Sequence, residues 1–166
     1  MNILINTIMS GFAAVGFSLV YKVPRKSLFG IYCCGGVGML TYLLMWEKGK
    51  FTFGAYLLSS LVIGITAEIF ARINKLPATV FLAPGLIPLV PGLAIYNMMN
   101  AFASKNITDA VYNIVNAGNY ALALALGIVL SSIFSRSMNN YRTYFKNVRN
   151  KRMEKNKNNK INKEIK

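Results

Sequence analysis

The sequence predicts an all-α membrane protein with five transmembrane helices, the fourth of which is broken by prolines. Hydrophobic residues make up 54% of the 166 residues and charged residues only 14%, whereas charged residues make up about 25% of a typical soluble domain. Because lipid offers the backbone no hydrogen-bond partner, long apolar segments are expected to be helices. Five runs contain no Asp, Glu, Lys or Arg, and all reach the about 17–25 residues that a spanning helix needs: residues 1–21, 27–46, 51–67, 76–104 and 110–135.

In chain order, the expected transmembrane helices cover residues 3–21, 28–46, 53–73, 80–102 and 117–135, and residues 1–135 form the predicted membrane domain. The basic residues that flank the helices set their orientation. With five spans, the loop between the first and second spans, the loop between the third and fourth spans and the C-terminal segment lie on the same side of the membrane. Together they hold 16 basic residues. The other side holds 3 basic residues, Lys48, Lys50 and Lys105. We therefore expect the N-terminus outside and the C-terminus in the cytoplasm.

The segment 136–166 is rich in Lys, Arg and Asn, with 11 basic and 2 acidic residues. It has too little apolar content to fold alone, so we expect a partly disordered cytoplasmic tail. Its charge predicts attraction to anionic lipids. A basic tail also permits nucleic-acid binding, but no base-reading or stacking module accompanies it, so we expect no nucleic-acid partner.

Glu68 is the acidic residue embedded in a predicted span, and Arg72 follows it by one helical turn. One interpretation is a proton-coupling carboxylate, because ionisable groups in spans are costly and usually face a cavity. The other is an ion pair at the membrane interface, since both side chains can reach the nearby helix end. The chain contains no histidine, so Glu68 is the best candidate for any proton relay.

Small residues four positions apart predict close helix packing. The pairs are Ser60 with Gly64, Ala121 with Ala125, and Ala123 with Gly127. Three amides at a spacing of three, Asn113, Asn116 and Asn119, lie where the last span is expected to begin. They indicate either a polar entry to that span or a ligand site.

Prolines and glycines interrupt the fourth span, and they provide the sharpest signal in the chain. Each interior proline removes a helical hydrogen bond, so the carbonyls of about Val80, Pro84 and Ile87 are expected to be free. Broken helices near the membrane centre form substrate sites in many secondary transporters; the alternative is a kinked structural helix. The candidate substrate-binding residues are Pro84, Gly85, Pro88, Pro91, Gly92, Asn97 and Asn100.

Four strings support a resemblance to a known family: AVGFSLVYKVPRKSL (14–28), AEIFAR (67–72), PATVF (77–81) and PGLIPLVPG (84–92). They resemble the small C-terminal half of the threonine/serine exporter family, and the likeness covers about residues 5–135. The resemblance implies a multi-pass exporter subunit in the plasma membrane of a bacterial-type cell. It further implies a larger partner subunit with a soluble N-terminal region, and transport driven by the proton motive force.

The sequence is thus expected to encode the small subunit of a two-component threonine/serine exporter that uses no cofactor and binds no metal. One alternative is a subunit of a small dicarboxylate (succinate) exporter, because some split pairs resemble those. Another is a non-transporting scaffold, in which the broken span would line no water-accessible cavity. We expect no enzyme, since the chain shows no nucleophile–base pair, metal-ligand cluster or phosphate loop. We also expect no export of the small-molecule substrate without the larger half.

Overall fold

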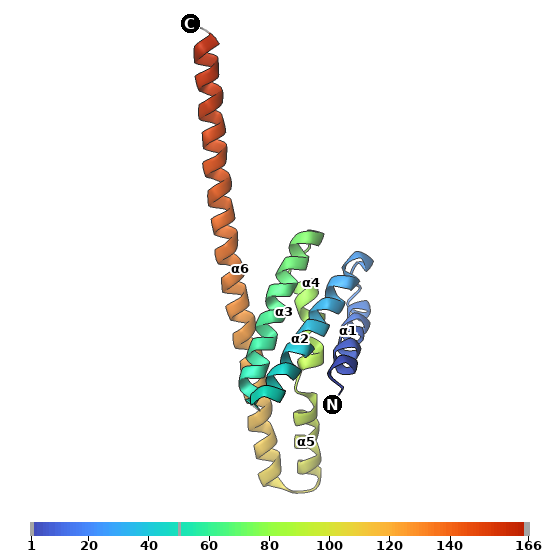
Figure 1. Ribbon diagram of the computed structural model, residues 1–166. Helices are drawn as coiled ribbons and strands as arrows, with labels where there is room; N and C mark the ends of the chain where they lie inside the picture. The colour runs from blue at the N-terminus through green and yellow to red at the C-terminus, as the bar shows by residue number, and fades with distance from the viewer. Residues whose placement is uncertain (1, 50, 165–166) are drawn as a thin grey trace. The chain divides into compact units, whose positions relative to one another are not determined.

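In the computed structural model, residues 2–49 and 51–164 are described, and they contain helices and no strands. Side chains are described for residues 2–47, 49 and 51–135. The chain divides into two compact units, residues 1–132 and residues 133–166. The first unit contains the broken helix and is the subject of the following sections. Figure 1 shows its helices with their labels.

The first three helices of this unit are α1 (Ile3–Val20), α2 (Leu28–Gly49) and α3 (Thr52–Asn74), and a short 3-10 turn, η1 (Arg25–Ser27), leads into α2. Small residues hold α1 against α2. A Cβ on Gly35 would lie 2.7 Å from the Ala14 Cβ, and the Ser10 hydroxyl donates a hydrogen bond of 2.9 Å to the Gly35 carbonyl. Helices α2 and α3 also pack against each other.

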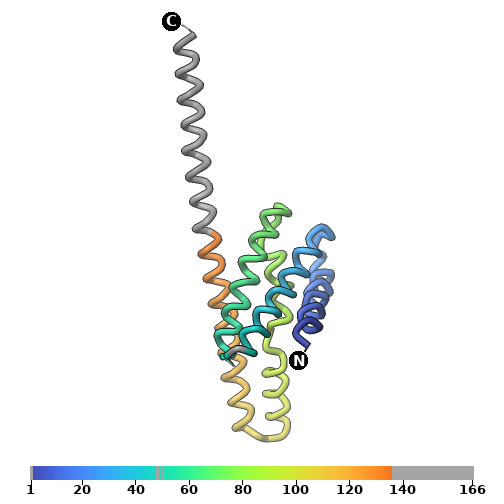
Figure 2. Tube along the Cα trace, in the orientation of Figure 1, coloured from blue at the N-terminus to red at the C-terminus, as the bar shows by residue number. Residues whose placement is uncertain are grey.

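The fourth span consists of two helices. Helix α4 (Thr79–Leu86) continues as the 3-10 turn η2 (Ile87–Leu89), and α5 (Gly92–Ala103) follows after Val90 and Pro91. The two halves are bent by 47°, and Figure 2 traces the chain through the break. Helix α4 packs against α1, α2 and α3. The core of the unit therefore lies between these four helices, around Ile31, Ile63 and Phe81.

The last helix, α6 (Ile107–Glu164), begins ten residues before the predicted start of the fifth span at 117. Asn106 and Asp109 explain the early start. The Asp109 amide donates to the Asn106 side-chain oxygen at 3.3 Å, and the Asn106 amide group donates to the Asp109 carboxylate at 2.6 Å. The first of these bonds caps one backbone N–H of the first turn, and the second holds the capping side chain in place. Residues 107–132 of α6 belong to the first unit.

By length and composition, four helical segments can cross a membrane: Ile3–Val20, Arg25–Glu47, Thr52–Asn74 and Ile107–Ser135. The bent pair Thr79–Leu89 and Gly92–Ala103 makes the fifth when it is counted as one span. The prediction of an all-α protein with a broken fourth helix is confirmed. The side of each terminus stays a prediction. So does the partial disorder of the tail; the backbone of α6 is helical up to Glu164.

Candidate functional site

The break in the fourth span is built from backbone turns around Val90. The Val90 amide donates to the Ile87 carbonyl at 3.2 Å, and the Gly92 amide donates to the Val90 carbonyl at 2.7 Å. Val90 has an extended backbone, with ψ of 132°, and Pro91 precedes the first helical residue of α5. The expectation of a free Ile87 carbonyl is wrong, because the 3-10 turn tightens the chain enough to supply a donor three residues later.

Helix α4 and η2 lie against the middle of α2 and α3. A Cβ on Gly85 would lie 3.0 Å from the Cβ of Cys34 on α2 and 3.4 Å from Cγ2 of Ile63 on α3. On α2, one turn beyond Cys34, a Cβ on Gly38 would lie 3.4 Å from Cδ1 of Leu89 in η2. Gly38 and Ile63 are each at the midpoint of their helices. The broken segment therefore begins at mid-length of two long membrane helices, and glycines make the close approach possible.

The predicted binding residues divide into two groups at the break. Pro84, Gly85 and Pro91 are buried and Pro88 is half-buried, so they form the packed side. Gly92, Asn97 and Asn100 are exposed on α5. Helix α5 has no buried residue at all among those described. Only one half of the broken span is thus held in the core, and the two amides are not brought against Pro84 or Gly85.

Glu68 and Arg72 form an ion pair on α3. The Arg72 Nε lies 3.9 Å from Glu68 Oε2, and the two side chains are 34% and 31% exposed. Glu68 is five residues beyond Ile63, which is about 7.5 Å along a helix. Glu68 lies on the same face of α3 as Ser60 and Gly64, because the three are spaced by four residues. Ile63 lies on the face that packs against α4. The candidate proton carrier and the broken span therefore lie on different faces of α3.

The face of α3 with Ser60 and Gly64 packs against α6 in a reciprocal crossing. A Cβ on Gly64 would meet the Ser131 side chain, and a Cβ on Gly127 would meet the Ser60 side chain and lie 2.5 Å from the Leu57 carbonyl oxygen. Because Ser60 pairs with Gly127 and Gly64 pairs with Ser131, the two helices run parallel. Two of the three predicted small pairs thus contribute residues to this crossing.

The third small pair, Ala121 with Ala125, is exposed, so it takes no part in this crossing and its role in packing stays a prediction. Sequence reasoning also missed Ser131, although it continues the series Ala123, Gly127 by a further four residues. A serine is small enough for close packing. Its hydroxyl donates to the Ile128 carbonyl at 2.8 Å, which satisfies it within its own helix.

Aromatic rings join α2, α3 and α6 near the end of α2, and sequence reasoning missed them too. Tyr56 lies 4.9 Å from Tyr42 and 4.8 Å from Tyr120 between ring centroids, and Tyr42 stacks on Trp46 at 6.3 Å. Tyr and Trp gather at membrane interfaces. This preference is the signal that could have located the cluster.

Ser60 is the ninth residue of α3, and Gly127, which meets it, is the twenty-first of α6. Since the helices are parallel, α6 begins about 18 Å before α3 does. Helix α5 and the start of α6 accordingly form a hairpin that extends past the start of α3 (Figure 1). The amides Asn113, Asn116 and Asn119 lie within this stretch of α6, and Asn113 donates to the Asp109 carbonyl at 2.8 Å.

Across the described side chains, no three His, Cys, Asp or Glu residues come close enough to hold a metal ion. The geometry that stands out is a helix broken at mid-length, with one half packed and one half exposed. Residues 6–134 match the sequence model of a family described as Threonine/Serine exporter, ThrE. No solved structure matches the chain.

Proposed function

The chain belongs to the threonine/serine exporter family, and from this premise we propose that it is the small subunit of a two-component secondary exporter of threonine and serine. Family membership and the apolar helices make it a membrane protein of exporter type. The single observation that carries the finer proposal is the break in the fourth span, which begins opposite the midpoints of α2 and α3.

The backbone at the break suits a small zwitterion. No side chain caps the start of α5, and the first amides of a helix have no partner within it. Leu93 and Ala94 thus offer N–H groups to a carboxylate, aided by the helix dipole. The carbonyls at the end of α4 and in η2 suit an ammonium group. The substrate is proposed to bind at Pro88 and Gly92, with the buried Pro84, Gly85 and Pro91 forming the packed wall of the site and Asn97 and Asn100 adding amide contacts.

The exposed surface of α5 supports a partner subunit. Leu93 is 74% and Met99 63% exposed, and either lipid or an apolar protein surface can cover them. Asn97 and Asn100 are exposed on the same helix, and burying an amide without a partner in hydrocarbon costs a few kcal/mol. A protein surface satisfies both kinds of group. We assign that surface to the larger subunit with a soluble N-terminal region.

The proposed energy source is the proton motive force, and Glu68 is the proposed proton carrier, with Arg72 as its partner. Glu68 is the one acidic side chain that forms an ion pair in the described part, and this pair is not fully buried within the chain. The complex is proposed to work in the plasma membrane of a bacterial-type cell, with the N-terminus outside.

Efflux from cells preloaded with labelled threonine, serine or succinate tests the proposal. Cells would express this chain alone, a larger family subunit alone, or both, with and without a protonophore. Threonine and serine efflux only with both subunits, and its loss with the protonophore, is the expected result. Efflux of succinate instead would favour the dicarboxylate alternative. No efflux from any combination, with both proteins present in the membrane, would favour a scaffold.

A further inference from the structure

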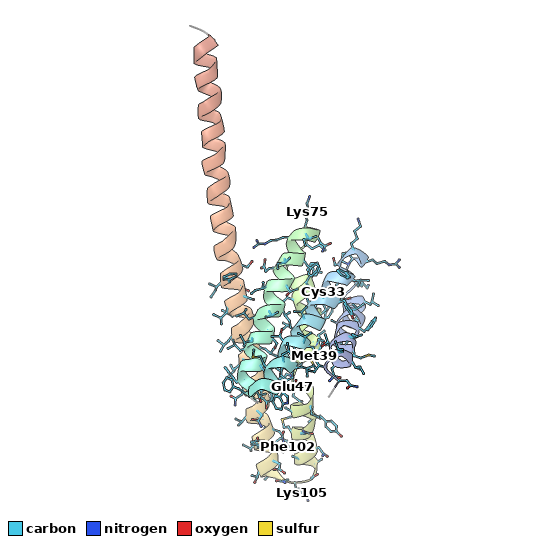
Figure 3. All side chains as sticks on the ribbon, viewed as in Figure 1. Cys33, Met39, Glu47, Lys75, Phe102 and Lys105 are labelled. Carbon is cyan, nitrogen blue, oxygen red and sulfur yellow. The ribbon has the colours of Figure 1, made fainter. Side chains whose placement is uncertain are left out.

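One end of the first unit carries a dense set of basic side chains, which we call the basic rim: Lys22, Arg25, Lys26, Arg72 and Lys75. Two separate segments supply them. The turn η1 packs against α3, and just beyond it the Phe29 ring lies 6.4 Å from that of Phe70. These contacts bring the start of α2 to the end of α3. Figure 3 shows Lys75 at this end of the unit and Lys105 at the opposite end.

The charge of the basic rim is not neutralised by the described side chains. Glu68 forms an ion pair with one rim residue, Arg72. The other described acids are Glu47, near the end of α2, and Asp109, which binds Asn106 next to Lys105. Lys22, Arg25 and Lys26 have no acidic partner within the described residues. The rim therefore presents five positive groups and one negative group.

The basic rim departs from the usual preferences in two respects, the charge at a helix start and the backbone conformation of lysine. Arg25 and Lys26 sit in the turn that leads into α2, although a helix start favours negative charge. Lys22 and Lys75 have φ of 53° and 55°, a backbone conformation that favours glycine. In addition, the fully buried Ser27 hydroxyl has no hydrogen-bond partner among the described residues. An anion held at the rim would offset the unfavourable position of Arg25 and Lys26 at the start of α2.

Exposed apolar side chains lie next to residues of the basic rim. Val20 is 76%, Phe29 72% and Ile73 68% exposed, and all three are within a few residues of a rim residue. A free phosphate would satisfy only the charges. A phospholipid satisfies both features, because its headgroup is anionic and its acyl chains are apolar.

We propose that the basic rim binds the phosphate of an anionic phospholipid, whose acyl chains lie along Val20, Phe29 and Ile73. This site is separate from the basic tail and independent of the transported substrate. It would tie the α1–α2 connection to the end of α3, the helix that also carries the face packed against α4.

Native mass spectrometry of the full chain in detergent tests the proposal, with phosphatidylglycerol and phosphatidylcholine as competing probes. The wild-type chain is expected to retain phosphatidylglycerol preferentially. The variant Lys22→Gln/Arg25→Gln/Lys26→Gln/Lys75→Gln should lose this preference, by about fivefold for each basic residue removed. A variant matched in charge, Lys155→Gln/Lys157→Gln/Lys160→Gln/Lys163→Gln, should lose much less of it, because the tail attracts anionic lipid through its net charge and does not form the proposed site. Equal loss in both variants would show that net charge alone attracts the lipid and would overturn the proposal.

A second set of variants separates charge from backbone strain. Lys22→Gly, Lys75→Gly and Lys105→Gly each remove one charge and relieve one left-handed lysine, since Lys105 also has φ of 56°. Only the first two should weaken phosphatidylglycerol binding. Inorganic phosphate is expected not to displace the lipid. If it does displace the lipid, the rim is a free-phosphate site and the proposal of a lipid site is wrong.

Discussion

At the scale of single residues, Ile63 and Gly64 show how adjacent positions on one helix take different partners. Ile63 contacts the broken span through Gly85, whereas Gly64 meets Ser131 on α6. Glu68 continues the Gly64 face. If Glu68 carries the proton, its charge therefore acts on the broken span through α3 itself rather than by direct contact.

The first prediction concerns Glu68. In Glu68→Gln the shape is kept and the titratable group is lost, so substrate exchange should continue while concentrative, pH-driven export is lost. The ion pair is partly exposed, so stability should fall by only about 0–1 kcal/mol. Counterflow and pH-jump uptake in liposomes that contain both subunits measure the two activities. Glu47→Gln, at an exposed position near the end of α2, is the control and should retain both. Unchanged pH-driven export in Glu68→Gln would place the proton path elsewhere.

The second prediction concerns the crossing of α3 and α6. In Gly127→Ala the new methyl group meets the Ser60 side chain and the backbone of Leu57 and Leu61, and backbone atoms cannot rotate away. The free energy of unfolding should fall by about 1–3 kcal/mol. Gly118→Ala on the same helix meets nothing within 4 Å and should be neutral or stabilising by up to about 1 kcal/mol. Unfolding by SDS in mixed micelles measures both, and equal effects would contradict the packing described for α6.

At the scale of elements, the fourth span combines a packed half and an exposed half. Pro88 and Pro91 cannot donate backbone hydrogen bonds, and two tight turns around Val90 join the halves at an angle of 47°. Helix α4 and η2 bury Phe81, Pro84, Gly85 and Leu89, whereas α5 buries none of its residues. The break thus separates a fixed element from one that is free to contact a partner.

The third prediction follows from this break. Pro88→Ala/Pro91→Ala restores two backbone donors and allows a continuous helix, because each interior proline costs a helix about 3 kcal/mol. Export should be abolished, while the amount of protein in the membrane and its circular dichroism should be unchanged. The control is Pro77→Ala, an exposed position two residues before α4, which should export normally. Normal export by the double variant would show that the break is structural only.

At the scale of the whole molecule, the number of crossings sets the sides of the two termini. Four continuous helices and one bent pair are long and apolar enough to span. Lys75 and Lys105 lie at opposite ends of the first unit (Figure 3), so the chain between them passes from one end to the other. The bent pair therefore traverses the unit instead of returning to its starting end.

The fourth prediction is the resulting topology. A tag placed before Met1 should be accessible from outside, and a tag after Lys166 should be accessible only from the cytoplasm. The excess of basic residues on one side supplies the physical reason. Protease protection in sealed vesicles of known orientation measures both ends. A fusion at Lys105, expected outside, is an internal check, and two termini on the same side would contradict five spans.

Much of this architecture could be predicted because it depends on local properties. The five charge-free runs predicted every membrane helix, and the ends of the first three differ from the structure by only a few residues. The early start of α6 was missed, although its cap, Asn106 with Asp109, is a local signal. The seven candidate binding residues were predicted from the prolines and glycines of the fourth span and from the two asparagines that follow, and their role in binding stays a prediction. Their division into a buried group and an exposed group was not foreseen.

The sequence by itself determined the helical class, the five apolar segments, the break and the family, because each depends on a single segment: its length, its lack of charge or its missing amide donors. Only the tertiary structure decided that Ile63 faces α4 and that α3 and α6 pack against each other at Gly64 and Gly127. It also decided that the ring of Tyr56 contacts the rings of Tyr42 and Tyr120 and that no residue of α5 is buried. The physical reason is the membrane environment. Residues that face lipid are as apolar as residues in the core, so a helix such as α3 has no polar face in its sequence to show which side is packed.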